Sequence, residues 1–139
     1  MNFSCLADIL DKQLELHSRL YELEEQKTAV LINGNTKELD SLLNQQQPLL
    51  MGVKNFEQQR ETLQNTMGIQ GLTITQLIKE YEEAGCLQAN YEAMTEKLTA
   101  LKRVSATNKR ILDQRLSLLD FILTSAGVKN GESVTYSNK

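Results

Sequence analysis

The chain has 139 residues, the size of one domain, and 40% of them are hydrophobic, although Trp is absent. Seven Gly and one Pro provide few turn signals, and Leu recurs at regular spacing among Glu, Gln, Lys and Asn, which favours a few long helices over strands. A net charge of −3 argues against a nucleic-acid-binding protein, which normally carries a basic stripe.

Targeting and cofactor signals are also absent from the sequence. The N-terminal residues lack a cationic segment followed by an apolar one, and no apolar run approaches the roughly 18 residues of a membrane span. Cys5 and Cys86 lack the spacing of a metal site or a disulfide framework. We therefore expect a cytoplasmic protein with reduced thiols, no membrane span, no nucleic-acid partner, no metal and no cofactor.

The first predicted helix begins near Ser4 and carries apolar residues at three- and four-residue spacing. This pattern weakens between Glu24 and Thr28. His17 lies on the same face, where a lone His is more often a packed residue than a metal ligand.

A turn and a second helix follow. Asn33, Gly34 and Asn35 predict a tight turn, because Asn and Gly tolerate positive φ. Asn35 with Glu38 three residues later is typical of an N-cap with a capping box. Pro48 predicts a kink or a break in the second helix, and a kink is favoured because the helical pattern resumes directly after it.

The predicted end of the third helix depends on whether Gly85 interrupts it. Residues 68–75, bounded by two glycines, predict a connector, and Thr73 with Gln76 predicts a capping box at its end. One interpretation is a short helix at about 73–84. The other is a helix that continues through Gly85, at a cost near 1 kcal/mol for a glycine inside a helix.

The last predicted helix covers about residues 87–126, which corresponds to about 60 Å, and Gly127 is typical of the residue that follows a helix end. Residues 128–139 are polar and predict a disordered tail. The predicted fold is therefore all-α: an elongated, coiled-coil-like antiparallel hairpin or bundle of three to four helices with a long last helix. Residues 1–127 would form its single domain.

The last helix carries more apolar surface than one helix–helix contact needs. At about 100° per residue, two adjacent stripes give an apolar arc of about 160°, against roughly 100° for a typical surface helix. The leucine stripe consists of Leu112, Leu116, Leu119 and Leu123, and the second stripe consists of Ile111, Leu118 and Ile122. The second stripe is either core, in a bundle or a homodimer, or a groove for a partner helix.

No catalytic constellation is present in the sequence. There is a single His and no glycine-rich phosphate loop, and carboxylate clusters such as Glu22, Glu24 and Glu25 are typical of solvated helix faces. We therefore expect no enzymatic activity. Long helices with a surplus apolar stripe are typical of a binding module.

Several stretches, taken in order, resemble the FlgN-type flagellar export chaperones, which are small acidic helical proteins. Residues 31–63 resemble the family's helix–turn–helix, with Phe-Glu followed shortly by Arg. Residues 108–123 resemble its late helix, in which an Asn precedes two apolar residues, and the tail resembles its post-helical tyrosine. The matching residues are Phe56, Glu57, Arg60, Asn108, Ile111, Leu112 and Tyr136.

The resemblance implies a cytosolic type III export chaperone. Such a protein binds the terminal helical segments of flagellar hook-associated proteins, keeps them unassembled and delivers them to the export gate. A structural coiled-coil or adaptor protein that oligomerises through the apolar stripe is the alternative, and a homodimer also stays open. The candidate client-binding residues are Ile111, Leu112, Leu118, Leu119 and Ile122, and Tyr136 is the candidate for docking on the cytosolic part of the gate.

Overall fold

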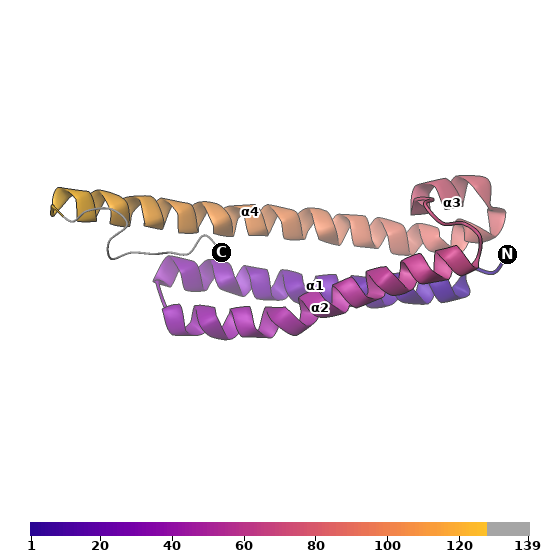
Figure 1. The fold of residues 1–139 in the computed structure, drawn as a ribbon, viewed down its shortest axis with the longest axis horizontal. Helices are drawn as coiled ribbons and strands as arrows, with labels where there is room; N and C mark the ends of the chain where they lie inside the picture. The colour runs from indigo at the N-terminus through magenta and orange to yellow at the C-terminus, as the bar shows by residue number, and fades with distance from the viewer. Residues whose placement is uncertain (128–139) are drawn as a thin grey trace.

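A computed structural model describes residues 1–127 of the chain, which contain helices and no strand. Helices α1 and α2 form an antiparallel hairpin, a short α3 and a 3₁₀ turn η1 follow, and the long α4 runs back along the hairpin (Figure 1). This confirms the predicted all-α bundle with a long last helix. The bounds are α1 Ser4–Asn33, α2 Thr36–Thr66, α3 Ile74–Glu80, η1 Glu82–Leu87 and α4 Gln88–Ser125.

The turn between α1 and α2 lies where the sequence predicts it. Gly34 has φ +73° and donates its backbone N–H to the Val30 carbonyl at 3.0 Å, which ends α1. The Asn35 side chain accepts a hydrogen bond from the Glu38 backbone N–H at 3.1 Å and caps α2. The Asn35 N–H bonds to Val30 instead of the Glu38 side chain, so the cap forms without the reciprocal half of the box.

Pro48 lies inside α2, which continues without interruption from Thr36 to Thr66. A break at this proline is therefore wrong, and Figure 1 shows α2 changing direction part-way along its length. The helical pattern on both sides of Pro48 maintains the helix despite the lost backbone donor.

The region around Gly85 corrects both interpretations of the sequence. Thr73 and Gln76 form the predicted capping box, with bonds of 2.8 and 3.1 Å. The helix that they start ends at Glu80, because Tyr81 adopts an extended backbone with φ −121° and ψ 121°. Gly85 lies in the 3₁₀ turn that follows, so it neither ends α3 nor continues it.

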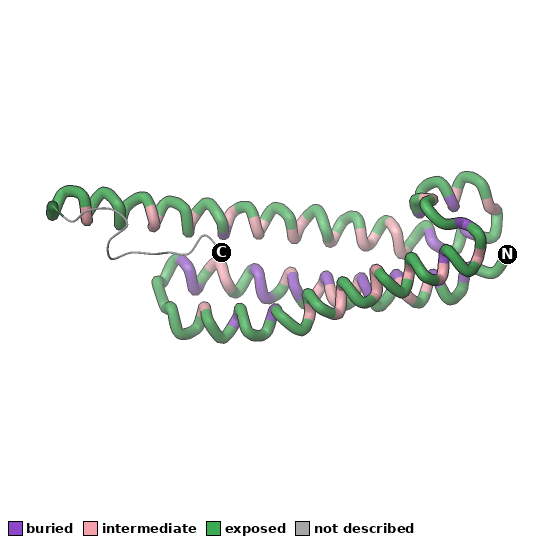
Figure 2. Tube along the Cα trace, in the orientation of Figure 1, coloured by how far each residue is buried: buried purple, intermediate pink, exposed green. Residues whose placement is uncertain are grey.

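The two ends of the molecule have different cores. The end that contains the N-terminus, α3 and η1 has a compact apolar core, whereas the α1–α2 turn end has a small one that consists of Leu23, Val30 and Leu42. Helix α1 packs along both α2 and α4, and within residues 1–127 no comparable packing joins α2 to α4. Figure 2 shows the buried positions concentrated on α1 and at the α3 end. The residues of the larger core are Phe3, Leu6, Leu10, Ile69, Ile74, Leu77, Ala84 and Leu87.

Candidate functional site

The predicted client-binding residues all lie in the second half of α4, and four of the five are exposed. Ile111 is half-buried. The exposed fractions of the others are 43% for Leu112, 57% for Leu118, 40% for Leu119 and 50% for Ile122. Large apolar side chains at this exposure form a candidate interaction surface.

These residues are exposed because α4 is longer than the helix on which it packs. Helix α4 has 38 residues and α1 has 30. Arg115 donates a hydrogen bond to the carbonyl of Ile32, close to the end of α1. Residues 116–125, here called the overhang, extend beyond the α1–α2 turn, and Figures 1 and 2 show this end of α4 projecting past the hairpin. The overhang therefore has no helix of the hairpin beneath it.

The direction of Asn108 shows which way the two stripes point. Asn108 is the one buried residue of α4 and bonds to α1, so its direction marks the face that packs on α1. At about 100° per residue, the leucine stripe lies roughly 20–80° to one side of Asn108 and the second stripe roughly 40–80° to the other. The two stripes therefore lie on either side of the face by which α4 packs on α1. Beyond Arg115 both stripes continue past the end of α1.

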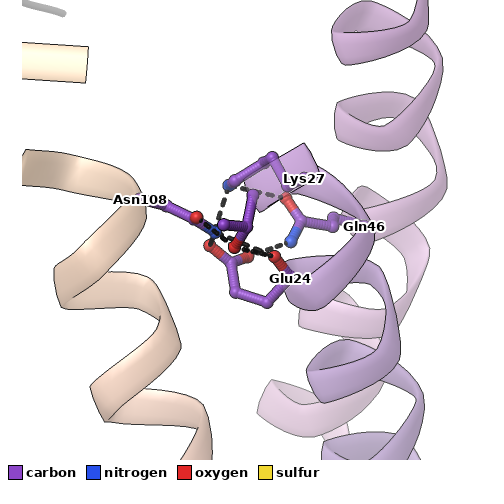
Figure 3. Close-up of polar contacts among 5 residues, drawn as sticks. Glu24, Lys27, Gln46 and Asn108 are labelled. Carbon is purple, nitrogen blue, oxygen red and sulfur yellow. Dashed lines mark hydrogen bonds and ion pairs between the residues drawn. The ribbon is translucent and has the colours of Figure 1, made fainter. Parts of the chain in front are cut away.

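A buried polar layer joins the three long helices next to this surface (Figure 3). The Asn108 amide donates to the Glu24 backbone carbonyl at 2.9 Å and to Glu24 Oε1 at 3.0 Å, and Gln46 of α2 donates to Glu24 Oε2. Lys27 forms an ion pair with Glu24 at 3.1 Å, and the Thr28 hydroxyl donates to Asn108 Oδ1. Glu24, Gln46 and Asn108 are each at most 7% exposed, so these bonds form largely away from water.

The environment of Glu24 stabilises its charged form. Burial alone would raise the pKa of this carboxyl group, but hydrogen bonds from Asn108, Gln46 and Lys27 and the charge of Lys27 outweigh that effect. The pKa of Glu24 is therefore lower than its usual value of 4.5.

A second polar network, near the α3 end, is anchored by two of the family-like residues. Glu57 and Arg60 form an ion pair, Gln13 of α1 donates to Glu57 at 3.1 Å, and Arg60 donates to Gln64. Gln64 donates to the Leu72 carbonyl at 3.0 Å, which ties the connector before α3 to α2. A cavity of about 560 Å³ lies beside this network. Gln13 Oε1 is buried without a hydrogen-bond partner within residues 1–127. Because the other groups named here bond one another and the backbone, we interpret the network as structural.

The assignment of Glu24 to a solvated helix face is wrong, because partners on α1, α2 and α4 bond its buried carboxylate, whereas Glu22 and Glu25 are exposed. The sequence also did not identify the buried glutamines of either network. Gln13, Gln46 and Gln64 are buried, although Gln is common on helix surfaces. A signal existed for Gln13, because it is spaced three and four residues from Leu10 and His17 on the apolar face of α1.

The remaining candidate residues show no reactive or metal-binding arrangement. His17 is buried, its Nδ1 has no hydrogen-bond partner within residues 1–127, and burial lowers its pKa from 6.5. Cys5 and Cys86 are free and exposed. The described part of the chain holds no group of His, Cys, Asp and Glu suited to a metal ion, and no helix there is long and apolar enough to cross a membrane. Tyr136 lies outside the described residues.

Comparisons with known proteins agree with the sequence resemblance. A family model described as "FlgN protein" matches residues 1–139. The chain is similar to the uncharacterized protein YvyG of Bacillus subtilis (strain 168), with 29% identity over 126 residues, which cover 86% of this chain and 77% of YvyG. No solved structure matches the chain significantly.

Replacing Asn108 with Ala is expected to lower the free energy of unfolding by about 1–3 kcal/mol, because the buried Glu24 carboxylate and backbone carbonyl and the half-buried Thr28 hydroxyl each lose one hydrogen bond. Urea unfolding followed by circular dichroism measures the change. Asn44→Ala, at an exposed position of α2, controls for the higher helix propensity of Ala. Equal destabilisation by the two variants would show that the polar layer contributes no stability.

The lowered pKa of Glu24 predicts a specific loss of stability in acid. In the unfolded chain Glu24 binds a proton near pH 4.5, whereas in the folded chain it binds one only at lower pH. Its contribution to the free energy of unfolding is therefore full above pH 4.5 and is lost as the pH falls through the folded pKa. Urea unfolding of wild type and Glu24→Gln between pH 7 and pH 3 measures this contribution. The stability difference between them should shrink on acidification.

His17 contributes in the same direction but at higher pH, because its folded pKa lies below 6.5 and the unfolded chain takes up the proton first. This effect is common to wild type and Glu24→Gln, so it cancels in their difference. A difference that stays constant down to pH 3 would contradict the assigned role of Glu24.

Proposed function

The chain belongs to the FlgN family, the flagellar export chaperones, and from this premise we propose that it binds the C-terminal helical segments of flagellar hook-associated proteins in the cytoplasm. The proposed binding surface is the apolar face of α4 at the overhang and the turn before it. The chaperone would keep its clients unassembled and deliver them to the flagellar export gate. The family is non-enzymatic.

The observation that carries this proposal is the overhang. Leu118 and Ile122 are at least half exposed although they flank the face by which α4 packs on α1. An amphipathic helix that continues in the direction of α1 would cover both stripes and place one apolar anchor about every turn. Covering the apolar face of a client helix in this way prevents that face from associating with other subunits.

Delivery requires a contact that leaves the client-binding surface free. Tyr136 is separated from the end of α4 by ten residues of polar sequence, so it can contact a second protein while α4 holds a client. A tyrosine provides a flat apolar ring with a hydrogen-bonding tip, which suits a weak and reversible contact. We assign Tyr136 the docking contact with the cytosolic part of the export gate.

Leu118→Asp and Ile122→Asp are each expected to weaken client binding about tenfold or more, because a carboxylate would be buried against apolar side chains without a partner. Both side chains are at least half exposed in the free protein, so its stability should change little. Calorimetric titration with C-terminal segments of hook-associated proteins measures the affinity, and thermal unfolding is recorded in parallel.

Ser117→Asp is the matched control, because Ser117 is exposed and points away from α1, roughly 180° from Asn108. It adds the same charge to the same helix and should bind clients as wild type does. If Leu118→Asp lowers the melting temperature strongly and the remaining folded protein binds normally, the stripe is core. If it converts a stable oligomer into monomers without affecting any client, the adaptor alternative is correct.

Tyr136→Ala is expected to leave client affinity unchanged and to lower affinity for the gate about tenfold, because the anchoring ring is lost. Tyr136→Phe retains the ring and should bind with intermediate affinity. Calorimetry with the soluble part of the gate, on chaperone preloaded with client, provides the measurement. Equal gate affinities for wild type and Tyr136→Ala would remove the docking role.

A further inference from the structure

A groove lies between α2 and α4 near the turn end of the molecule. In this half of the hairpin α1 lies between the two outer helices (Figure 1), and no close packing joins α2 to α4 within residues 1–127. The groove holds a cavity of about 380 Å³. Leu31 of α1, Leu39 and Leu43 of α2, and Leu112 of α4 line it. Helix α1 thus forms the base of the groove, and α2 and α4 form its two walls.

The groove is apolar and continuous with the overhang. Leu43 is 40% exposed and Leu112 is 43% exposed, whereas Leu31 at its base is buried. Leu112 also begins the leucine stripe, and Leu119 lies two turns further along the same face of α4. A helix that lies on the overhang could therefore extend into the groove without changing direction.

Charge at the groove identifies the kind of helix that fits. Glu24 lines the groove, but its carboxylate bonds to Lys27, Gln46 and Asn108 within the polar layer. Lys109 also lines the groove, is exposed and forms no ion pair within residues 1–127. The free charge at the groove is therefore positive, which complements an acidic side chain.

We propose that this groove receives an amphipathic client helix with an acidic residue beside its apolar face. The apolar anchors of the helix contact Leu39 and Leu43 on one side and Leu112 on the other, and its acidic residue pairs with Lys109. Helix α2 is thereby a second wall of the client site, which otherwise consists of α4 alone. This inference rests on the proposed function, because the occupant is the client segment.

Leu43→Asp tests the apolar wall and Lys109→Glu tests the charge. With a C-terminal segment of a hook-associated protein as the probe, Leu43→Asp should raise Kd about tenfold or more. Lys109→Glu should raise Kd about threefold to tenfold and flatten its dependence on salt, because the attraction becomes repulsion. Calorimetry at low and at physiological salt measures both effects.

The matched controls add the same charges outside the groove. Met51→Asp alters an α2 side chain that is 66% exposed and does not line the groove. Lys102→Glu reverses an exposed charge that lies about two turns of α4 before Lys109 and does not line the groove. Both should bind within about twofold of wild type. If both groove variants also bind as wild type does while Leu118→Asp still abolishes binding, the groove is not part of the site and the proposed function stands. If no client segment binds even to wild type, both proposals fail.

A photo-cross-linking residue at position 43 provides a second test that does not depend on the stability of Leu43→Asp. Cross-linking to the client segment at position 43, with none at position 51, supports the groove. A cross-link to a second copy of the chain, or within the chain to residues 128–139, identifies another occupant and overturns the proposal. Mass spectrometry of the cross-linked peptides distinguishes these outcomes.

Discussion

The arrangement of the three long helices depends on the buried carboxylate of Glu24. A charged group at 6% exposure is costly unless it is fully bonded, and each of its bonding groups comes from a defined place: Lys27 one turn along α1, Gln46 on α2 and Asn108 on α4. Sliding either outer helix by one turn would move its amide away and leave the charge unpaired. The polar layer therefore sets the register of α2 and α4 against α1.

That register determines which apolar residues are covered. With Asn108 held opposite Glu24, Arg115 reaches the last turn of α1, and the remaining residues of α4 extend past the hairpin. The buried apolar cluster at this end is small and consists of Leu23, Val30 and Leu42, whereas the other end has a larger core closed by α3 and η1. One end of the molecule is thus a closed bundle and the other is open, and the open end carries the proposed client surface.

Several residues that carry the family resemblance have structural roles. Glu57 and Arg60 pair with each other and connect through Gln64 to the connector before α3, and Asn108 occupies the polar layer. These side chains fix the positions of the helices, whereas Ile111 and Leu112 directly after Asn108 belong to the apolar surface. Within one turn of α4, a residue that positions the helices is therefore followed by residues of the candidate binding surface.

The sequence by itself determined the helical class, the turn at Gly34, the caps at Asn35 and Thr73, and the length of the last helix, because local periodicity and turn chemistry specify these features. It also determined that α4 carries two apolar stripes. Periodicity assigns a residue to a face of a helix but not to what lies opposite that face. Only the tertiary structure decided that α1 ends beside Arg115, that α2 and α4 leave a groove between them, and that buried glutamines bond to Glu24 and Glu57. Each of these features depends on contacts between segments that are far apart in the chain.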